Sequence, residues 1–245
     1  WRRKPTVATE FVAVVNAARI MNKAIIVAKG LRAFPKMRER LAGFIDVWWI
    51  VDSSSLALLV GYLLLKAHPW KKCKLRVFAV AEGTDNAQDM EQEVVRQLTA
   101  LRITASVKVV RLPAQSGNGP VDWQWSEEAR RSPDMKSGGS GSPGTNADGT
   151  RKATSPVTRR PSGRGAASGS SSFEDSVHAF ARVAESLRHL IKQESADSAL
   201  LIMDLPITDG TTDPFFYMDL VELLTRDCLR CVLVHSSGLS VINSE

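Results

Sequence analysis

The apolar residues of the chain follow two patterns: short uninterrupted runs, and positions that recur every three or four residues. An uninterrupted run is typical of a strand buried on both faces, and the wider spacing is typical of an amphipathic helix. The first pattern predicts strands at Ala24–Ala28, Ile45–Val51, Leu75–Val80, Ala105–Val110, Ala199–Met203, Cys231–Val234 and Val241–Ile242. The second predicts helices at Val7–Met21, Ser55–Ala67, Phe215–Leu224, from a cap at Asn86 to Leu101, and from about Phe173 to Gln193.

Strands and helices alternate from Ala24 onward, an order that favours right-handed crossovers between parallel strands. The sequence therefore predicts an α/β fold with a mostly parallel sheet and helices on both faces. The apolar segment near the two adjacent tryptophans does not change this picture. Leu56–Leu65 is only about half as long as the roughly 20 apolar residues of a membrane-spanning helix, and the polar turn Asp52–Ser55 separates it from Ile45–Val51. We expect a strand, a turn capped by Ser53 or Ser54, and a buried helix.

Residues 114–172 interrupt both patterns. This segment is rich in Ser, Gly, Pro and Arg and has almost no aliphatic residues. Such a composition buries too little apolar area to offset the loss of chain entropy, so we expect a disordered linker inserted into one crossover.

The formal net charge of +6 is unevenly distributed along the 245 residues. Residues 1–45 hold about ten Lys and Arg against two acids, whereas residues 173–245 hold about five against twelve. The basic part has three possible partners: solvent, the acidic part of the same fold or of a dimer, and an anionic membrane surface. No basic–aromatic motif indicates nucleic acid. With only three cysteines and no apolar stretch after the opening WRRKP, we expect a reducing compartment and no signal peptide.

Four polar loops follow strands of the predicted sheet, where open α/β folds bind ligands. Serine-rich turns there can hold phosphate, but no glycine-rich phosphate motif is present, and ordinary caps and turns are the favoured explanation. The loops are Asp52–Ser55, Glu82–Asn86, Asp204–Gly210 and His235–Gly238.

Three further features invite a chemical interpretation. Cys228 and Cys231 match C-x-x-C, but they lie between a helix and a strand instead of at a helix start, which favours structural cysteines over redox or zinc chemistry. His235-Ser236-Ser237-Gly238 lacks the first glycine of a nucleophile elbow. Asp46 lies inside an apolar strand and needs hydrogen-bond donors or a basic partner. We predict no catalytic, cofactor or metal residues, and no enzyme.

Several segments resemble the carboxy-terminal cytosolic domain of cation–chloride cotransporters. KAIIVAKGLRAFP is similar to that family's A-L-L-V-A-K-N-x-x-x-F-P, and LRITASVKVV is similar to L-R-I-x-A-x-V-x-V-V. The front half is closer to the potassium–chloride branch, and the tail shares features with sodium-coupled members. The remaining matches are Ile45–Val51, Trp70 to Phe78, Leu187–Pro206, Tyr217-Met218 and CVLVHSSGLSV from Cys231.

The resemblance implies two α/β halves like those of universal stress proteins, which dimerise on the cytosolic side of a membrane. Residues 1–41 would end the first half, and residues 42–113 with 173–245 would form the second. The family's transmembrane transport domain, with its ion sites, would lie upstream. The implied function is regulation and dimerisation of an electroneutral potassium–chloride symporter that serves ion transport and cell volume regulation. The alternative is a soluble nucleotide- or anion-binding α/β protein of the universal-stress type.

Regulation is expected in the linker. The resemblance places a regulatory phosphothreonine of the potassium–chloride branch near Val183, which has no hydroxyl group. Thr154 and Ser162 instead follow basic residues at the positions that basophilic protein kinases recognise. Phosphate would add about −1.5 to −2 charge at each site.

Overall fold

The computed structural model describes residues 4–50, 55–81, 86–112, 170–206 and 213–236, with the backbone alone described for 170–180. The linker predicted at 114–172 lies almost entirely outside these residues, and so do Ser53, Ser54 and the strand predicted at Val241–Ile242. The helix predicted near Phe173 begins at Ser170, just inside the predicted linker.

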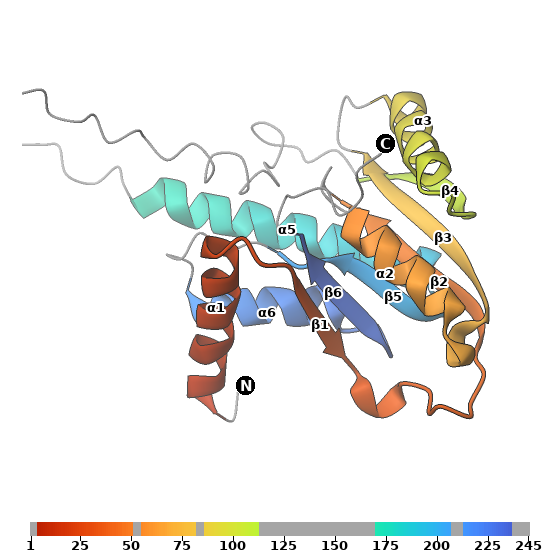
Figure 1. The fold of residues 1–245 in the computed structure, drawn as a ribbon. Helices are drawn as coiled ribbons and strands as arrows, with labels where there is room; N and C mark the ends of the chain where they lie inside the picture. The colour runs from red at the N-terminus through yellow and green to blue at the C-terminus, as the bar shows by residue number, and fades with distance from the viewer. Residues whose placement is uncertain (1–3, 51–54, 82–85, 113–169, 207–212, 237–245) are drawn as a thin grey trace, which may run out of the picture.

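The strands form one six-stranded sheet in the order β1-β6-β5-β2-β3-β4 (Figure 1). The four pairings between β6 and β4 are parallel, and β1 pairs antiparallel with β6. This confirms the prediction of a mostly parallel α/β sheet. The strands are β1 (Ile25–Lys29), β2 (Ala42–Trp49), β3 (Lys72–Ala81), β4 (Ser106–Arg111), β5 (Ser198–Asp204) and β6 (Cys231–His235).

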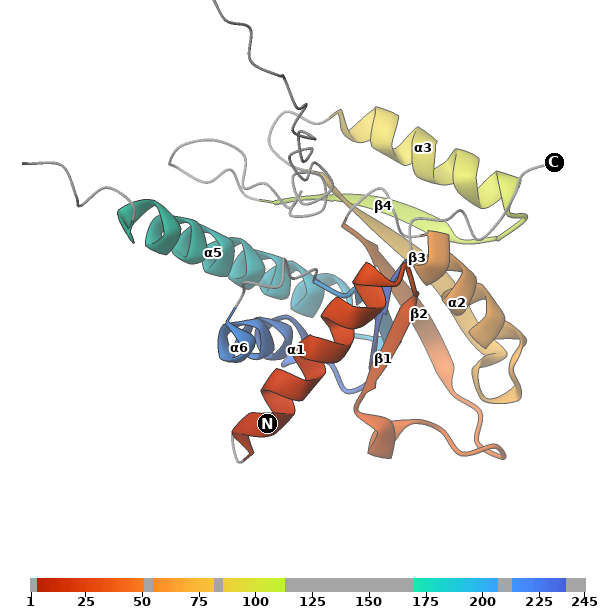
Figure 2. The ribbon, with the colours of Figure 1, turned by 60° about the vertical axis from the view of Figure 1, so that its left-hand side comes forward.

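Helices cover both faces of the sheet (Figure 2). One face packs against α1, α5 and α6, and the other against α2 and α3. The helices are α1 (Pro5–Ile20), α2 (Ser55–Lys66), α3 (Ala87–Ala100), α5 (Ser170–Glu194) and α6 (Pro214–Thr225), with 3-10 turns η1 (Leu31–Ala33) and η2 (His68–Trp70). Asn86 caps α3 as predicted, because its side chain accepts a hydrogen bond of 3.1 Å from the Gln88 backbone N–H.

The central strand β2 explains the uninterrupted apolar run around the tryptophans. Ile45, Val47 and Trp49 are buried under α2, while Trp48 is buried on the opposite face and stacks on Phe78 with ring centroids 4.9 Å apart. Burial on both faces leaves no position for an exposed polar side chain in the second half of the strand.

The strand β1 shows where the sequence pattern is insufficient. Only the 3-10 turn η1, and no α-helix, connects it to β2, so the prediction that strands alternate with helices from Ala24 onward is wrong at this position. Without a crossover helix, β1 runs antiparallel along β6, with Val27 opposite Leu233. In this structure residues 25–29 therefore belong to the same sheet as β2–β6. Their assignment to the end of a first half-domain stays a prediction.

Candidate functional site

The polar loops predicted to bind an anion lie largely outside the described residues. At this edge of the sheet, the structure describes two hydrogen bonds that hold the first turn of α6. The hydroxyl of Tyr217 donates a hydrogen bond of 2.8 Å to the Pro206 carbonyl, and the Asp213 side chain accepts from the Phe216 backbone N–H at 2.8 Å. Burial raises the pKa of Tyr217. Nucleotide or anion binding at this edge stays the alternative to the function that the resemblance implies.

The buried carboxylate of Asp46 has the basic partner that its position in an apolar strand requires. Asp46 is fully buried on β2, and its two oxygens accept hydrogen bonds of 2.8 Å from Nε and Nη2 of Arg76 on β3. The two residues are direct cross-strand partners. The same Nη2 donates at 2.7 Å to Asp197, which lies between α5 and β5. A single guanidinium therefore joins β2, β3 and the start of β5.

The environment of Arg76 indicates a structural role. Hydrogen bonding to Asp46, with a further contribution from Asp197, raises the pKa of Arg76 against the opposing effect of burial. The guanidinium carbon also lies 3.8 Å from the centroid of the Phe44 ring, a cation–π contact. With both carboxylates and one aromatic face engaged, this group is a stable ion-pair network and offers no free acid or base for catalysis.

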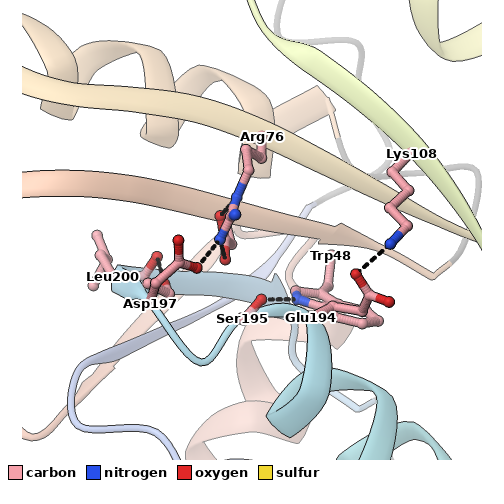
Figure 3. Close-up of polar contacts among 9 residues, drawn as sticks. Trp48, Arg76, Lys108, Glu194, Ser195, Asp197 and Leu200 are labelled. Atoms are coloured by element: carbon pink, nitrogen blue, oxygen red, sulfur yellow. Dashed lines mark hydrogen bonds and ion pairs between the residues drawn. The ribbon is translucent and has the colours of Figure 1, made fainter.

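A second group of contacts fixes the corner where α5 enters β5 (Figure 3). The Trp48 indole N–H donates a hydrogen bond of 3.0 Å to the Ser195 hydroxyl, which satisfies its buried polar atom. Lys108 on β4 forms an ion pair of 2.5 Å with Glu194 at the end of α5. Both contacts join residues on opposite sides of the insertion.

The C-x-x-C pair lies where the sequence predicted, with Cys228 after α6 and Cys231 at the first position of β6. A side-chain hydrogen bond from Cys231, together with the charge of Lys29, lowers the pKa of Cys228 against burial and Asp227. The same hydrogen bond and burial raise the pKa of Cys231. Both thiols are free. The position between a helix and a strand is the one that the sequence indicated, and it is not that of a redox motif.

Comparisons with known proteins agree with the resemblance seen in the sequence. The family model "Solute carrier family 12" matches residues 6–123. The protein named Cation-chloride cotransporter 1 of Oryza sativa subsp. japonica is 28% identical over 260 residues, which cover 99% of this chain and 24% of that protein. These matches support assignment of the chain to the cation–chloride cotransporter family. Two further relatives agree with this family assignment. Potassium/chloride cotransporter 3 of Caenorhabditis elegans is 41% identical over 37% of the chain and 9% of its own length, and Cation-chloride cotransporter 1 of Arabidopsis thaliana is 27% identical over 99% and 24%.

The cotransporter chain spans about a quarter of the length of the full-length relatives it matches from end to end, 24% in both plant proteins. Within the residues that the structure describes, no helix has both the length and the apolar character needed to cross a membrane.

Both phosphorylation candidates of this chain, Thr154 and Ser162, lie outside the described residues. Val183, at the position of the family's expected phosphothreonine, is buried in α5 with 4% of its surface exposed. The structure shows an apolar side chain inside the fold at this position, and the loss of the family's phosphorylation switch stays a prediction.

Two connections in this family member were missed by the sequence analysis. Lys29 on β1 contacts α6 through Glu222 at 3.0 Å and the Thr225 hydroxyl at 2.7 Å. Arg230 donates hydrogen bonds to the carbonyls of Ala33 at 2.5 Å and Ala199 at 3.0 Å. The only available signal was the opposite charge of the two ends of the chain, and Lys29–Glu222 is one ion pair of that kind.

Proposed function

We propose that this chain forms a cytosolic carboxy-terminal regulatory and dimerisation domain of an electroneutral cation–chloride symporter of the potassium–chloride branch, with no catalytic role. One observation carries the proposal: an α/β unit matches only a quarter of relatives that are named cotransporters. The remaining length of those relatives leaves room for the transport domain. The higher identity to a potassium/chloride cotransporter over 92 residues supports the branch.

The test uses the full-length cotransporter from which this chain derives. Chloride-dependent rubidium uptake is measured in cells that express the wild type, the Arg76→Ala variant and the matched surface variant Arg96→Ala. Arg76 holds the buried Asp46, whereas 76% of the Arg96 side chain is exposed and its ion pair is with Glu93, one turn earlier in α3. We expect Arg76→Ala to change uptake per transporter at the surface and to reduce cross-linked dimer, and Arg96→Ala to change neither. Equal uptake and equal dimer in all three would contradict the proposal.

The alternative function is tested on the purified chain. If the protein were a nucleotide- or anion-binding protein of the universal-stress type, equilibrium dialysis with ATP or inorganic phosphate would detect stoichiometric binding. We expect no saturable binding in either case.

Regulation through Thr154 and Ser162 is part of the same proposal. Two phosphates would add about −3 to −4 charge to a basic segment, which weakens its attraction to anionic partners. In the full-length protein, Thr154→Ala with Ser162→Ala is expected to change uptake in swollen or resting cells. Unchanged uptake in both conditions, with no phosphopeptide from either position in the wild type, would rule out this regulation.

A further inference from the structure

Eight exposed cationic side chains gather at the end of the sheet where β2 and β3 begin. They come from the loop after β1, the end of α2, and the residues that connect η2 to β3. We call them the basic edge: Arg32, Lys36, Arg38, Arg40, Lys66, Lys71, Lys72 and Lys74. In the stretches 30–41 and 66–74, the one acidic residue is Glu39, whose carboxylate accepts a hydrogen bond of 2.9 Å from the Lys36 backbone N–H.

Specific contacts hold these segments together as one surface. The Leu41 backbone N–H donates at 2.8 Å to the Pro69 carbonyl, and Arg40 Nε donates at 2.9 Å to His68 Nε2. The Phe34 ring packs edge-on against Trp70 with centroids 6.0 Å apart. Figure 1 shows the loop after β1 and the turn after α2 at the same end of the molecule. The cations therefore have a fixed place on the fold.

The basic edge lacks the carboxylate partners that several other cations of the structure have. Lys29, Arg76 and Lys108 each form an ion pair with an acid on another element. Among the described residues, no side chain of the basic edge forms an ion pair. Its positive charges are therefore available to an external anionic partner.

Apolar side chains stand exposed among these charges. Met37 is 82% exposed and Leu31 is 67% exposed, in the same loop as Arg32, Lys36 and Arg38. A surface that only maintains solubility has no need for such side chains. A surface that lies on a bilayer uses cations for lipid phosphates and carboxylates, and apolar side chains for the boundary between headgroups and acyl chains.

The aromatic residues of this region argue against nucleic acid as the partner. Single-stranded nucleic acid is bound by exposed rings on which bases stack. Here Trp70 is only 4% exposed and packs against the partly buried Phe34. The exposed apolar groups are an aliphatic side chain and a thioether, which suit lipid better than bases.

We propose that the basic edge, with Leu31 and Met37, is a docking surface for an anionic lipid bilayer. This inference deepens the proposed function, because a symporter's cytosolic domain is held beside a membrane. Its success or failure is nevertheless measured by lipid binding, whereas the proposed function is measured by ion uptake, so the two can fail separately.

The test is sedimentation of the purified 245-residue chain with phosphatidylcholine vesicles that contain or lack phosphatidylserine. The variant Lys36→Glu/Arg38→Glu reverses two charges of the basic edge. The matched control Lys23→Glu/Arg111→Glu makes the same net change at the opposite end of the sheet, where both residues are exposed. Circular dichroism confirms that both variants are folded. Met37→Gln, which leaves the net charge unchanged, tests the apolar contribution.

We expect binding to phosphatidylserine vesicles that weakens as ionic strength rises. Each lost cation weakens binding about fivefold, so the basic-edge variant loses at least about tenfold. The control variant loses less than about twofold, and Met37→Gln weakens binding although it leaves the charge unchanged. Absence of wild-type binding, equal loss in both double variants, or tighter binding to a single-stranded oligonucleotide than to vesicles would each overturn the proposal.

Discussion

A β-carbon built on Gly30 would lie 2.2 Å from the carbonyl oxygen of Leu229. Gly30 has a φ of +80° and connects β1 to η1, while Leu229 lies just before β6. The loop after β1, which carries part of the basic edge, therefore begins where its backbone contacts the backbone of Leu229. Beside this contact, Arg230 donates a hydrogen bond to the Ala33 carbonyl.

The first prediction concerns this contact. Gly30→Ala adds both a left-handed backbone strain and a clash with backbone, so we expect a loss of about 2 kcal/mol or more in the free energy of unfolding. The matched control is Leu229→Ala, which retains the carbonyl and removes a side chain that is 65% exposed. It should change stability by less than about 0.5 kcal/mol. Urea denaturation measures both, and equal midpoints for the two variants would contradict the prediction.

The second prediction concerns the buried ion pair. Arg76→Met leaves the fully buried Asp46 carboxylate without its partner, which should cost about 3 kcal/mol. The double variant Asp46→Leu/Arg76→Met removes the buried charge as well and should be more stable than Arg76→Met. Asp197→Ala removes only the partner that is 60% exposed and should cost less than about 1 kcal/mol. If the double variant were less stable than Arg76→Met, the charge pair itself would be required for stability, and the prediction would be wrong.

The third prediction concerns cysteine reactivity. The pKa of Cys228 is lowered by the Cys231 hydrogen bond, whereas burial raises the pKa of Cys73. At neutral pH, iodoacetamide should therefore alkylate Cys228 at least about tenfold faster than Cys73, as followed by peptide mass spectrometry. Cys231→Ala should slow the reaction, because it removes the side-chain donor that lowers the pKa of Cys228. Equal labelling rates of Cys228 and Cys73 in the folded protein would be inconsistent with the observed contacts.

The fourth prediction concerns stability at high pH. Burial raises the pKa of Tyr217 above its ordinary value of about 10. Above pH 10 the unfolded chain releases the phenolic proton while the folded chain retains it, so the free energy of unfolding falls as pH rises. In a Tyr62→Phe background, where Tyr217 is the one remaining tyrosine, the phenolate absorbance should appear together with loss of the far-ultraviolet circular dichroism signal. Ionisation of Tyr217 in a chain that is still folded would disprove this.

Much of the cotransporter fold could be predicted from the sequence because burial leaves a direct pattern. The run from Ile45 predicts a strand covered on both faces, and the spacing of Val94 and Leu98 predicts the buried face of α3. The partner of a strand leaves no such pattern. Nothing in Ile25–Lys29 indicates that it pairs with β6, about two hundred residues later in the chain, and runs antiparallel to it.

The polar contacts were predictable only in part. A carboxylate at Asp46 requires a basic partner, but the choice of Arg76 depends on the register of β2 against β3. The basic edge depends on how the loop after β1 packs against η2, through contacts such as Phe34–Trp70. The charges were visible in the sequence, and their common surface was not.

The position of the insertion between β4 and β5 has a consequence for biosynthesis. The hydrogen bond from Trp48 to Ser195 spans 147 residues, and β2 is flanked by β5 as well as β3. While the ribosome translates the insertion, β2 to β4 have emerged, but the partner for the other edge of β2 does not yet exist. Non-local pairing of this kind is slow and leaves apolar strands open to aggregation. We therefore expect nascent cotransporter chains to require chaperones at this stage, and a premature stop in the insertion to yield an aggregated polypeptide instead of a smaller folded domain.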